Sequence, residues 1–228
     1  MIPFHAVSEK SIVVAGESMV ARADGSLLWE RRSTLFVADV HLGKAATFRS
    51  HAVPIPVGTT ASTLDRLGCA LHTTRARRLI VLGDLWHAKE GRRNEIFASL
   101  RSWRESFSSV EVTLVEGNHD RRSGVMPDGL AITVVEEPFV DGPFALCHYP
   151  CKLDGAYCLA GHIHPSVSLR AGARQRLNLP CFWFSDCCGV LPAFGDFTGT
   201  ARIEPAAGDQ VVVIADGELH TVGFVPTG

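Results

Sequence analysis

Long apolar runs are missing from this sequence of 228 residues. The longest, such as residues 211–215, are far shorter than the roughly 18 residues that a membrane span needs. Residues 1–5 contain no cationic segment followed by an apolar block, which is the pattern of a secretory signal. We therefore expect a cytoplasmic protein without a membrane partner.

Paired C-x-x-C spacing is also missing, although the chain has seven cysteines. A structural zinc site needs four suitably spaced soft ligands, and this spacing does not supply them. We expect reduced, buried thiols that pack as small apolar side chains. The neighbours Cys187 and Cys188 leave a redox-active pair as the alternative.

The sequence has no large excess of positive or negative charge, and it has no segment typical of a linker between domains. The net charge is −2, so any binding of nucleic acid must come from a local basic face. No repeat and no long segment rich in proline, glycine and serine divides the chain. A single domain over residues 1–228 is expected.

What the sequence does contain is an alternation of strands and helices in its first half. Short apolar runs at residues 34–38, 79–82 and 112–115 are typical of strands buried on both faces. Residues 58–73 and 94–107 have the apolar spacing of amphipathic helices. The first half therefore predicts a βαβαβ arrangement.

The second half contains strands almost alone. Its apolar stretches are residues 131–135, 144–147, 156–160, 166–170 and 176–184. Hairpins are predicted around Asp24-Gly25 and around Asp216-Gly217, since both dipeptides accept the positive φ angles of tight turns. The whole pattern predicts an α/β fold, leaning towards α+β, in which two packed sheets have helices outside them.

Polar clusters follow three successive strands of the first half. They are Asp39-Val40-His41, Gly83-Asp84 and Gly117-Asn118-His119-Asp120. Ligands bind beyond the carboxyl ends of strands in open α/β sheets, so we expect these clusters to converge.

Two more clusters, Cys147-His148-Tyr149 and Gly161-His162-Ile163-His164, occur in the second half. If the backbone is extended, alternation places both side chains of Asp39-x-His41 on one face, and likewise both of His162-x-His164. Imidazole and carboxylate together suit manganese, iron, zinc or nickel better than calcium or magnesium.

The order of the five clusters resembles the calcineurin-like metallophosphoesterase superfamily, whose signature runs D-x-H, G-D, G-N-H-D/E, H and G-H-x-H. The resemblance implies a four-layer αββα sandwich of two mixed β-sheets flanked by helices. It also implies two divalent metal ions, with manganese expected first and iron, zinc or nickel as alternatives. The implied ligands are Asp39, His41 and His164 for the first ion, Asn118, His148 and His162 for the second, and Asp84 for both.

The resemblance further implies how a phosphate ester is hydrolysed. A hydroxide bridging the two ions attacks phosphorus in line. His119 then protonates the leaving group as general acid, and Asp120 orients or polarises His119.

Gly83-Asp84-Leu85-Trp86-His87 is similar to the G-D-L-F-H block of double-strand-break repair nucleases of this superfamily, in which the histidine helps to place the DNA phosphate. His87 holds that position, and the alternative for it is a surface histidine at the start of a helix.

A second resemblance covers nearly the whole chain. Residues 39–44 with Phe48-Arg49, and residues 191–195 leading into 197–199, resemble the ligase-associated DNA damage response endonuclease family, a bacterial branch of small phosphoesterases. This resemblance implies DNA as substrate and a repair role alongside an ATP-dependent DNA ligase and a helicase. The cations near the metal-binding strand ends would contact substrate phosphates through charge-assisted bonds. They are Lys44, Arg49, Arg121 and Arg122.

Three interpretations follow from the sequence. The first is a DNA-directed phosphodiesterase or endonuclease. The second is a small-molecule nucleotide phosphodiesterase or pyrophosphatase on the same fold. The third is a non-catalytic interaction module, which the complete set of ligand positions disfavours.

Overall fold

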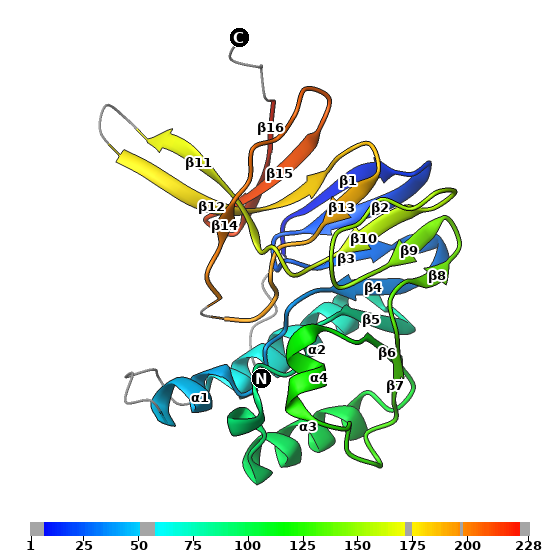
Figure 1. The fold of residues 1–228 in the computed structure, drawn as a ribbon, viewed down its shortest axis with the longest axis vertical. Helices are drawn as coiled ribbons and strands as arrows, with labels where there is room; N and C mark the ends of the chain where they lie inside the picture. Colours follow the sequence, from blue (N-terminus) through cyan, green and yellow to red (C-terminus); the bar gives the residue numbers. More distant parts are fainter. Residues whose placement is uncertain (1–6, 51–57, 172–174, 197, 224–228) are drawn as a thin grey trace.

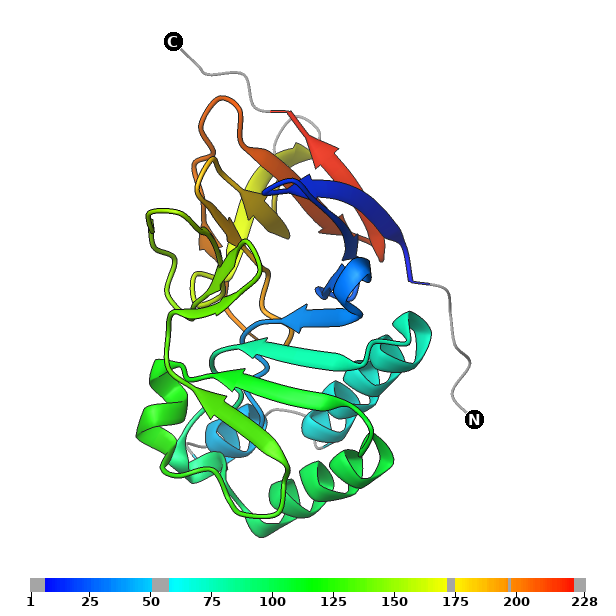
Figure 2. The same ribbon diagram turned by 90° about the vertical axis from the view of Figure 1, so that its right-hand side faces the viewer.

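A computed structural model of the chain describes residues 7–50, 58–171, 175–196 and 198–223. Two β-sheets pack against each other, and the helices lie along the outer side of one of them (Figures 1 and 2). The strands of the first sheet, in spatial order, are β1 (Glu9–Val14), β2 (Glu17–Arg22), β3 (Leu27–Trp29), β4 (Thr34–Val37), β5 (Arg78–Leu82), β6 (Glu111–Val115) and β7 (Ile132–Val135).

The second sheet is built from the rest of the chain. Its strands, in sequence order, are β8 (Phe139–Asp141), β9 (Phe144–Leu146), β10 (Tyr157–Ala160), β11 (Pro165–Ala171), β12 (Gln175–Phe184), β13 (Cys188–Val190), β14 (Ala201–Arg202), β15 (Gln210–Ala215) and β16 (Glu218–Val222). The helices are α1 (Lys44–Ser50), α2 (Thr59–Thr74), α3 (Asn94–Ser106) and α4 (Asn118–Ser123), with single 3₁₀ turns η1 (Glu30–Arg32) and η2 (Lys89–Gly91).

Both sheets are mixed, as expected. Strands β1 to β4 pair antiparallel and β4 to β7 pair parallel, so the carboxyl ends of β4, β5 and β6 meet at one edge. In the second sheet β10 pairs parallel with both β9 and β13. One sequence interpretation was wrong here: residues 131–135 do not open the second sheet, since β7 adds to β6 in the first.

The core has two layers because the strands alternate their side chains between faces. Leu35, Val37 and Val81 pack towards the apolar sides of α2 and α3. Phe36 and Ile80 point the other way and are buried between the sheets. The central strands are therefore covered on both faces, which explains their continuous apolar sequence.

Both predicted hairpins are confirmed. β2 and β3 flank Asp24-Gly25, and β15 and β16 flank Asp216-Gly217, where φ is 51° and 77°. The hairpin of β1 and β2 was not predicted, although its turn at Ala15-Gly16 also has two positive φ angles.

The α/β sandwich of two mixed sheets is confirmed, but the helices flank one sheet only. Among the described residues no α-helix follows Ser123, so the second helical layer of the αββα arrangement is not formed in that part of the chain. The far face of the second sheet instead carries two small apolar clusters, one around Cys158 and one around Val211.

Candidate metal centre

The five predicted clusters converge where strands of both sheets end. Asp39, Asp84 and Asn118 follow β4, β5 and β6, while His148 follows β9 and His162 follows β10. The potential ligand atoms of the histidines and aspartates fall into two groups, and within each group they lie within 4.8 Å of one another. One group is Asp39, His41 and His164; the other is Asp84, His148 and His162.

In the first group, lone pairs face one another. The Nδ1 of His164 lies 2.9 Å from the carbonyl oxygen of Gly199, so it donates its proton there and leaves the Nε2 lone pair pointing inward. This Nε2 is 3.4 Å from Nε2 of His41 and 3.4 Å from Oδ1 of Asp39. Although burial opposes protonation, the Asp39 carboxylate raises the pKa of His164. A cation is the natural partner for such a set of acceptors.

In the second group, too, acceptor atoms face one another. The Nδ1 of His148 lies 3.2 Å from the carbonyl oxygen of Leu82, so its Nε2 is the acceptor atom. Around this Nε2 lie Nδ1 of His162 at 3.1 Å and Oδ1 of Asn118 at 3.0 Å. Oδ1 of Asp84 is 3.5 Å away. These donor-poor contacts fit a metal ion, and they bring together the expected ligands of the second site.

Asp84 belongs to the second group and is also close enough to the first to sense its charge. Its Oδ1 accepts the backbone N–H of His119 at 2.9 Å and is close to His148 of the second group. Burial raises the pKa of Asp84 to about 8, and the negative charge of Asp39, in the first group, adds to this rise. A carboxylate in this place would remain ionised at neutral pH if cations adjoined it.

The backbone at the site differs from the expected extended form. Five non-glycine residues have left-handed φ angles of 51° to 67°, a conformation that such residues rarely adopt. They are Asp39, His41, Asp84, His162 and His164. The two pairs therefore do not share a face through strand alternation; sharp turns after the strands direct them. Strain of about 1–3 kcal/mol at each such residue is typical of functional sites.

Glycines make room for these ligands. Gly83 has a φ of 79°, and a Cβ there would collide with the ring of His148. A Cβ on Gly117 would collide with the carboxylate of Asp84. The glycines of the G-D and G-N-H-D blocks thus permit the close approach that the two groups require.

His119 faces the same space from the first turn of α4. Its Nδ1 contacts the carbonyl oxygen of His87, and its Nε2 lies 3.9 Å from Oδ2 of Asp84. The His87 ring stacks on that of His119 with 5.1 Å between centroids, and it lies 5.3 Å from the ring of His41. His87 therefore belongs to the site, and its backbone orients His119.

Asp120 does not have the contact expected for it. Its two oxygens accept backbone N–H groups of Trp86 at 2.9 Å and Gly117 at 3.0 Å. Burial raises the pKa of Asp120 to about 6. Asp120 thus connects the two loops that hold Asp84 and Asn118. The sequence predicted that Asp120 would orient His119, but the carbonyl oxygen of His87 makes that contact instead.

The four cations differ in position. Lys44 is half-buried at the start of α1. Burial lowers the pKa of Lys44, and the nearby carboxylates of Asp39 and Asp84 partly oppose this lowering. Arg121 and Arg122 are exposed on α4, and Arg121 pairs with Glu116 at 3.1 Å. The side chain of Arg49 lies outside the described residues.

Two further residues adjoin the second group and were not predicted. The Tyr149 hydroxyl donates to Oδ1 of Asn118 at 3.0 Å, and its ring lies 4.3 Å from that of His162. Glu137 accepts the N–H groups of His148 at 2.7 Å and Tyr149 at 3.0 Å. The position next to His148 was a signal for Tyr149, whereas nothing in the sequence marked Glu137.

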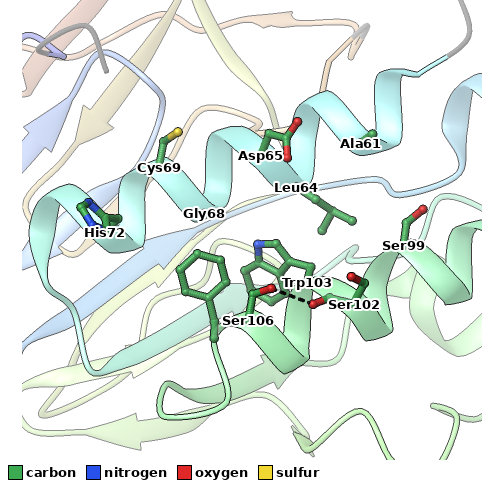
Figure 3. Close-up of a pocket in the computed structure, with 11 residues that line it drawn as sticks. Ala61, Leu64, Asp65, Gly68, Cys69, His72, Ser99, Ser102, Trp103 and Ser106 are labelled. Carbon is green, nitrogen blue, oxygen red and sulfur yellow. Dashed lines mark hydrogen bonds between the residues drawn. The ribbon is translucent and has the colours of Figure 1, made fainter. Parts of the chain in front are cut away.

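A cavity between two helices lies away from this site. About 630 Å³ lies between α2 and α3, lined by residues that include Leu64, Trp103 and Phe107 (Figure 3). None of the predicted site residues lines it. The chemistry therefore belongs to the strand ends rather than to this groove.

The buried carboxyl of Asp84 makes the stability of the metal-free protein depend on pH. Its pKa is about 8 when folded against an ordinary 3.8, so between these values the folded state keeps a proton that the unfolded state has lost. The free energy of unfolding then falls as pH rises, until pH passes about 8. In EDTA we expect the melting temperature of the wild type to fall more between about pH 6.5 and 8 than that of Asp84→Asn.

Other titrating groups are common to both proteins, so the difference between their slopes isolates Asp84. Manganese should remove the fall in the wild type, because a bound cation stabilises the ionised carboxylate. Scanning fluorimetry measures both effects. Equal slopes for wild type and Asp84→Asn in EDTA would contradict the assignment.

No protein-family model matches the chain, and no curated protein does. Among solved structures, the crystal structure of the Pseudomonas putida nuclease MPE is similar, with a TM-score of 0.84 and 38% sequence identity. The match covers 94% of this chain and 100% of that chain. No helix in the described parts is long and apolar enough to cross a membrane.

Proposed function

The chain belongs to the same family as the Pseudomonas putida nuclease MPE, and from this premise we propose that it is a metal-dependent nuclease acting on DNA. The observation that carries the proposal is the convergence of two ligand groups, in which Asp84 of the second group is close enough to Asp39 of the first for the Asp39 charge to raise its pKa. We also propose that the family is a branch of the calcineurin-like metallophosphoesterases.

In this proposal two divalent ions occupy the centre, with manganese as the first candidate. Asp39, His41 and His164 would hold the first ion, Asn118, His148 and His162 would hold the second, and Asp84 would be a ligand of both. When bound, the ions would supply an activated water at neutral pH and neutralise charge on the phosphoryl oxygens.

The protein's own part in the reaction is positioning and proton transfer. The His87 carbonyl holds Nδ1 of His119, so Nε2 is the atom that delivers a proton to the leaving oxygen. Tyr149 fixes Oδ1 of Asn118 through its hydroxyl, and Glu137 holds the backbone beneath His148. Lys44 adds positive charge beside the first group.

A polynucleotide substrate is favoured over a nucleotide by the nuclease relative and by the cations near the centre. Lys44 is half-buried beside the first group, and Arg121 and Arg122 are exposed on α4. These cations would contact the backbone phosphates of a DNA strand that extends past the metals. A repair role with an ATP-dependent ligase and a helicase remains part of the proposal.

A metal-resolved panel tests the function directly. Purified protein is stripped with EDTA and reloaded with manganese, nickel, zinc or magnesium. It is then assayed on nicked, gapped and single-stranded DNA, on nucleotides and on bis-p-nitrophenyl phosphate. We expect metal-dependent cleavage of DNA. Hydrolysis of nucleotides with no cleavage of DNA under any metal would replace the nuclease with the small-molecule enzyme.

Lys44 should distinguish DNA from a small diester. Lys44→Ala removes a cation beside the ligand group, and a DNA strand extends past the metals to reach it, whereas a small diester spans only the metals. We expect the KM for DNA to rise about 5- to 30-fold, which corresponds to the loss of about 1–2 kcal/mol of charge-assisted contact, with little change for bis-p-nitrophenyl phosphate.

Arg101→Ala, which removes an exposed cation from α3, is the matched control and should change neither substrate. Equal losses on both substrates would show that Lys44 supports the metal centre instead of the DNA.

A further inference from the structure

Four of the seven cysteines meet on the face of the second sheet that points away from the first sheet. Cys158 in β10 and Cys188 in β13 are direct register partners in a parallel pair, so their side chains lie next to each other on one face. Cys147 comes two residues after Ala145, the β9 partner of Cys158, and shares that face. Cys151, in the loop after β9, packs against the same cluster.

For three of the four cysteines, the distances between the sulfur atoms are those of ligands around one ion. The Sγ of Cys151 is 3.5 Å from that of Cys147 and 3.7 Å from that of Cys158. These three sulfur atoms lie within 4.8 Å of one another, and Cys188 is not part of that group. A tetrahedral zinc ion with Zn–S bonds of about 2.3 Å places its sulfur ligands about 3.8 Å apart.

The surroundings suit a structural site. Cys147, Cys158 and Cys188 are buried, while Cys151 is half-buried and leaves a path for an ion to enter. All seven cysteines are free thiols. A disulfide would need sulfur atoms about 2.05 Å apart, far closer than the thiols lie.

We propose that Cys147, Cys151 and Cys158 bind one zinc ion as thiolates, and that Cys188, the register partner of Cys158, supplies the fourth thiolate. Binding releases the thiol protons to solvent. The ion would tie the loop between β9 and β10 to β13. Because His148 directly follows Cys147, the zinc ion would also anchor the segment that carries His148 and Tyr149. This site is separate from the proposed dinuclear centre, which contains no sulfur ligand.

The proposal reverses the expectation from cysteine spacing. Spacing along the chain identifies zinc sites built from a compact loop, whereas this cluster draws its ligands from two strands, β10 and β13, and from the loop after β9. The parallel register of β10 with β13 and β9 brings them together, and that register is not visible in the sequence.

Cobalt substitution tests the site independently of activity. The intact protein is stripped of metal under reducing conditions and reloaded with Co²⁺. We expect the ultraviolet thiolate-to-cobalt charge-transfer band of a tetrahedral sulfur site, which nitrogen and oxygen ligands cannot produce. In Cys151→Ser the band should be lost or greatly weakened, and zinc-grown protein should contain one ion fewer per chain. Cys69→Ser, a half-buried cysteine on α2, is the matched control and should retain both.

Thiol labelling of the wild type avoids any dependence on the folding of a variant. Zinc should protect four thiols from a thiol-reactive reagent, and a chelator should expose them. Absence of the charge-transfer band, or an equal band in Cys151→Ser, would overturn the proposal. So would a mass decrease of two hydrogens per bond without reductant, which indicates a disulfide.

Discussion

Asp84→Asn is expected to reduce cleavage of every substrate to background while the fold persists. The amide is neutral and has a single acceptor oxygen, so it cannot join two cations as the carboxylate can. Folding should survive, since burial already favours the neutral form of this side chain, with a pKa of about 8, in the metal-free protein. Activity assays with saturating manganese measure cleavage, metal analysis measures the bound ions, and circular dichroism measures folding.

The matched control is Asp65→Asn, which neutralises an exposed carboxyl on α2. It should leave activity and metal content unchanged. Near-wild-type turnover of Asp84→Asn at saturating manganese would refute a mechanism that depends on a bridging carboxylate.

His119→Asn should lower turnover without removing metal, because His119 is assigned a proton and not an ion. Nε2 of His119 lies 3.9 Å from the Asp84 carboxylate, at the edge of the centre. General acid catalysis contributes about 10²–10⁴-fold, so we expect a loss of that order with DNA, whose leaving alkoxide needs a proton. For esters of p-nitrophenol, a good leaving group, the loss should be much smaller.

The comparison of leaving groups makes this prediction specific. His220→Asn, on exposed β16, controls for the general effect of removing a histidine. Equal losses for poor and good leaving groups, or a loss of bound metal, would show that His119 positions the centre and does not donate the proton.

The convergence of the candidate metal ligands is the part that the sequence predicted best. Their blocks, D-x-H, G-D, G-N-H-D, H and G-H-x-H, lie at strand ends that short apolar runs already marked. Parallel strands place their carboxyl ends at one edge, so the ligand types and their order predicted convergence before any contact was known. The hairpins at Asp24-Gly25 and Asp216-Gly217 were equally local, since they depend on φ angles that the dipeptides accept.

Details that depend on contacts between distant segments were not predicted. Asp120 was expected to hold His119. Instead, the loop after β5 places the carbonyl oxygen of His87 against Nδ1 of His119, and the N–H of Trp86 in the same loop donates to Asp120. Glu137 supports His148 from a segment with no motif of its own.

By itself, the sequence determined the strand-and-helix order, the types of metal-ligand side chain and the absence of a long apolar run. Only the tertiary structure decided that helices cover one sheet and that Tyr149 joins the centre. It also decided that four cysteines with no zinc-like spacing meet beside β10. The physical reason is that side-chain type and local φ preference are encoded residue by residue. Strand register and loop closure, by contrast, are set by packing over the whole chain, and a shift of one residue turns every side chain of a strand to the other face.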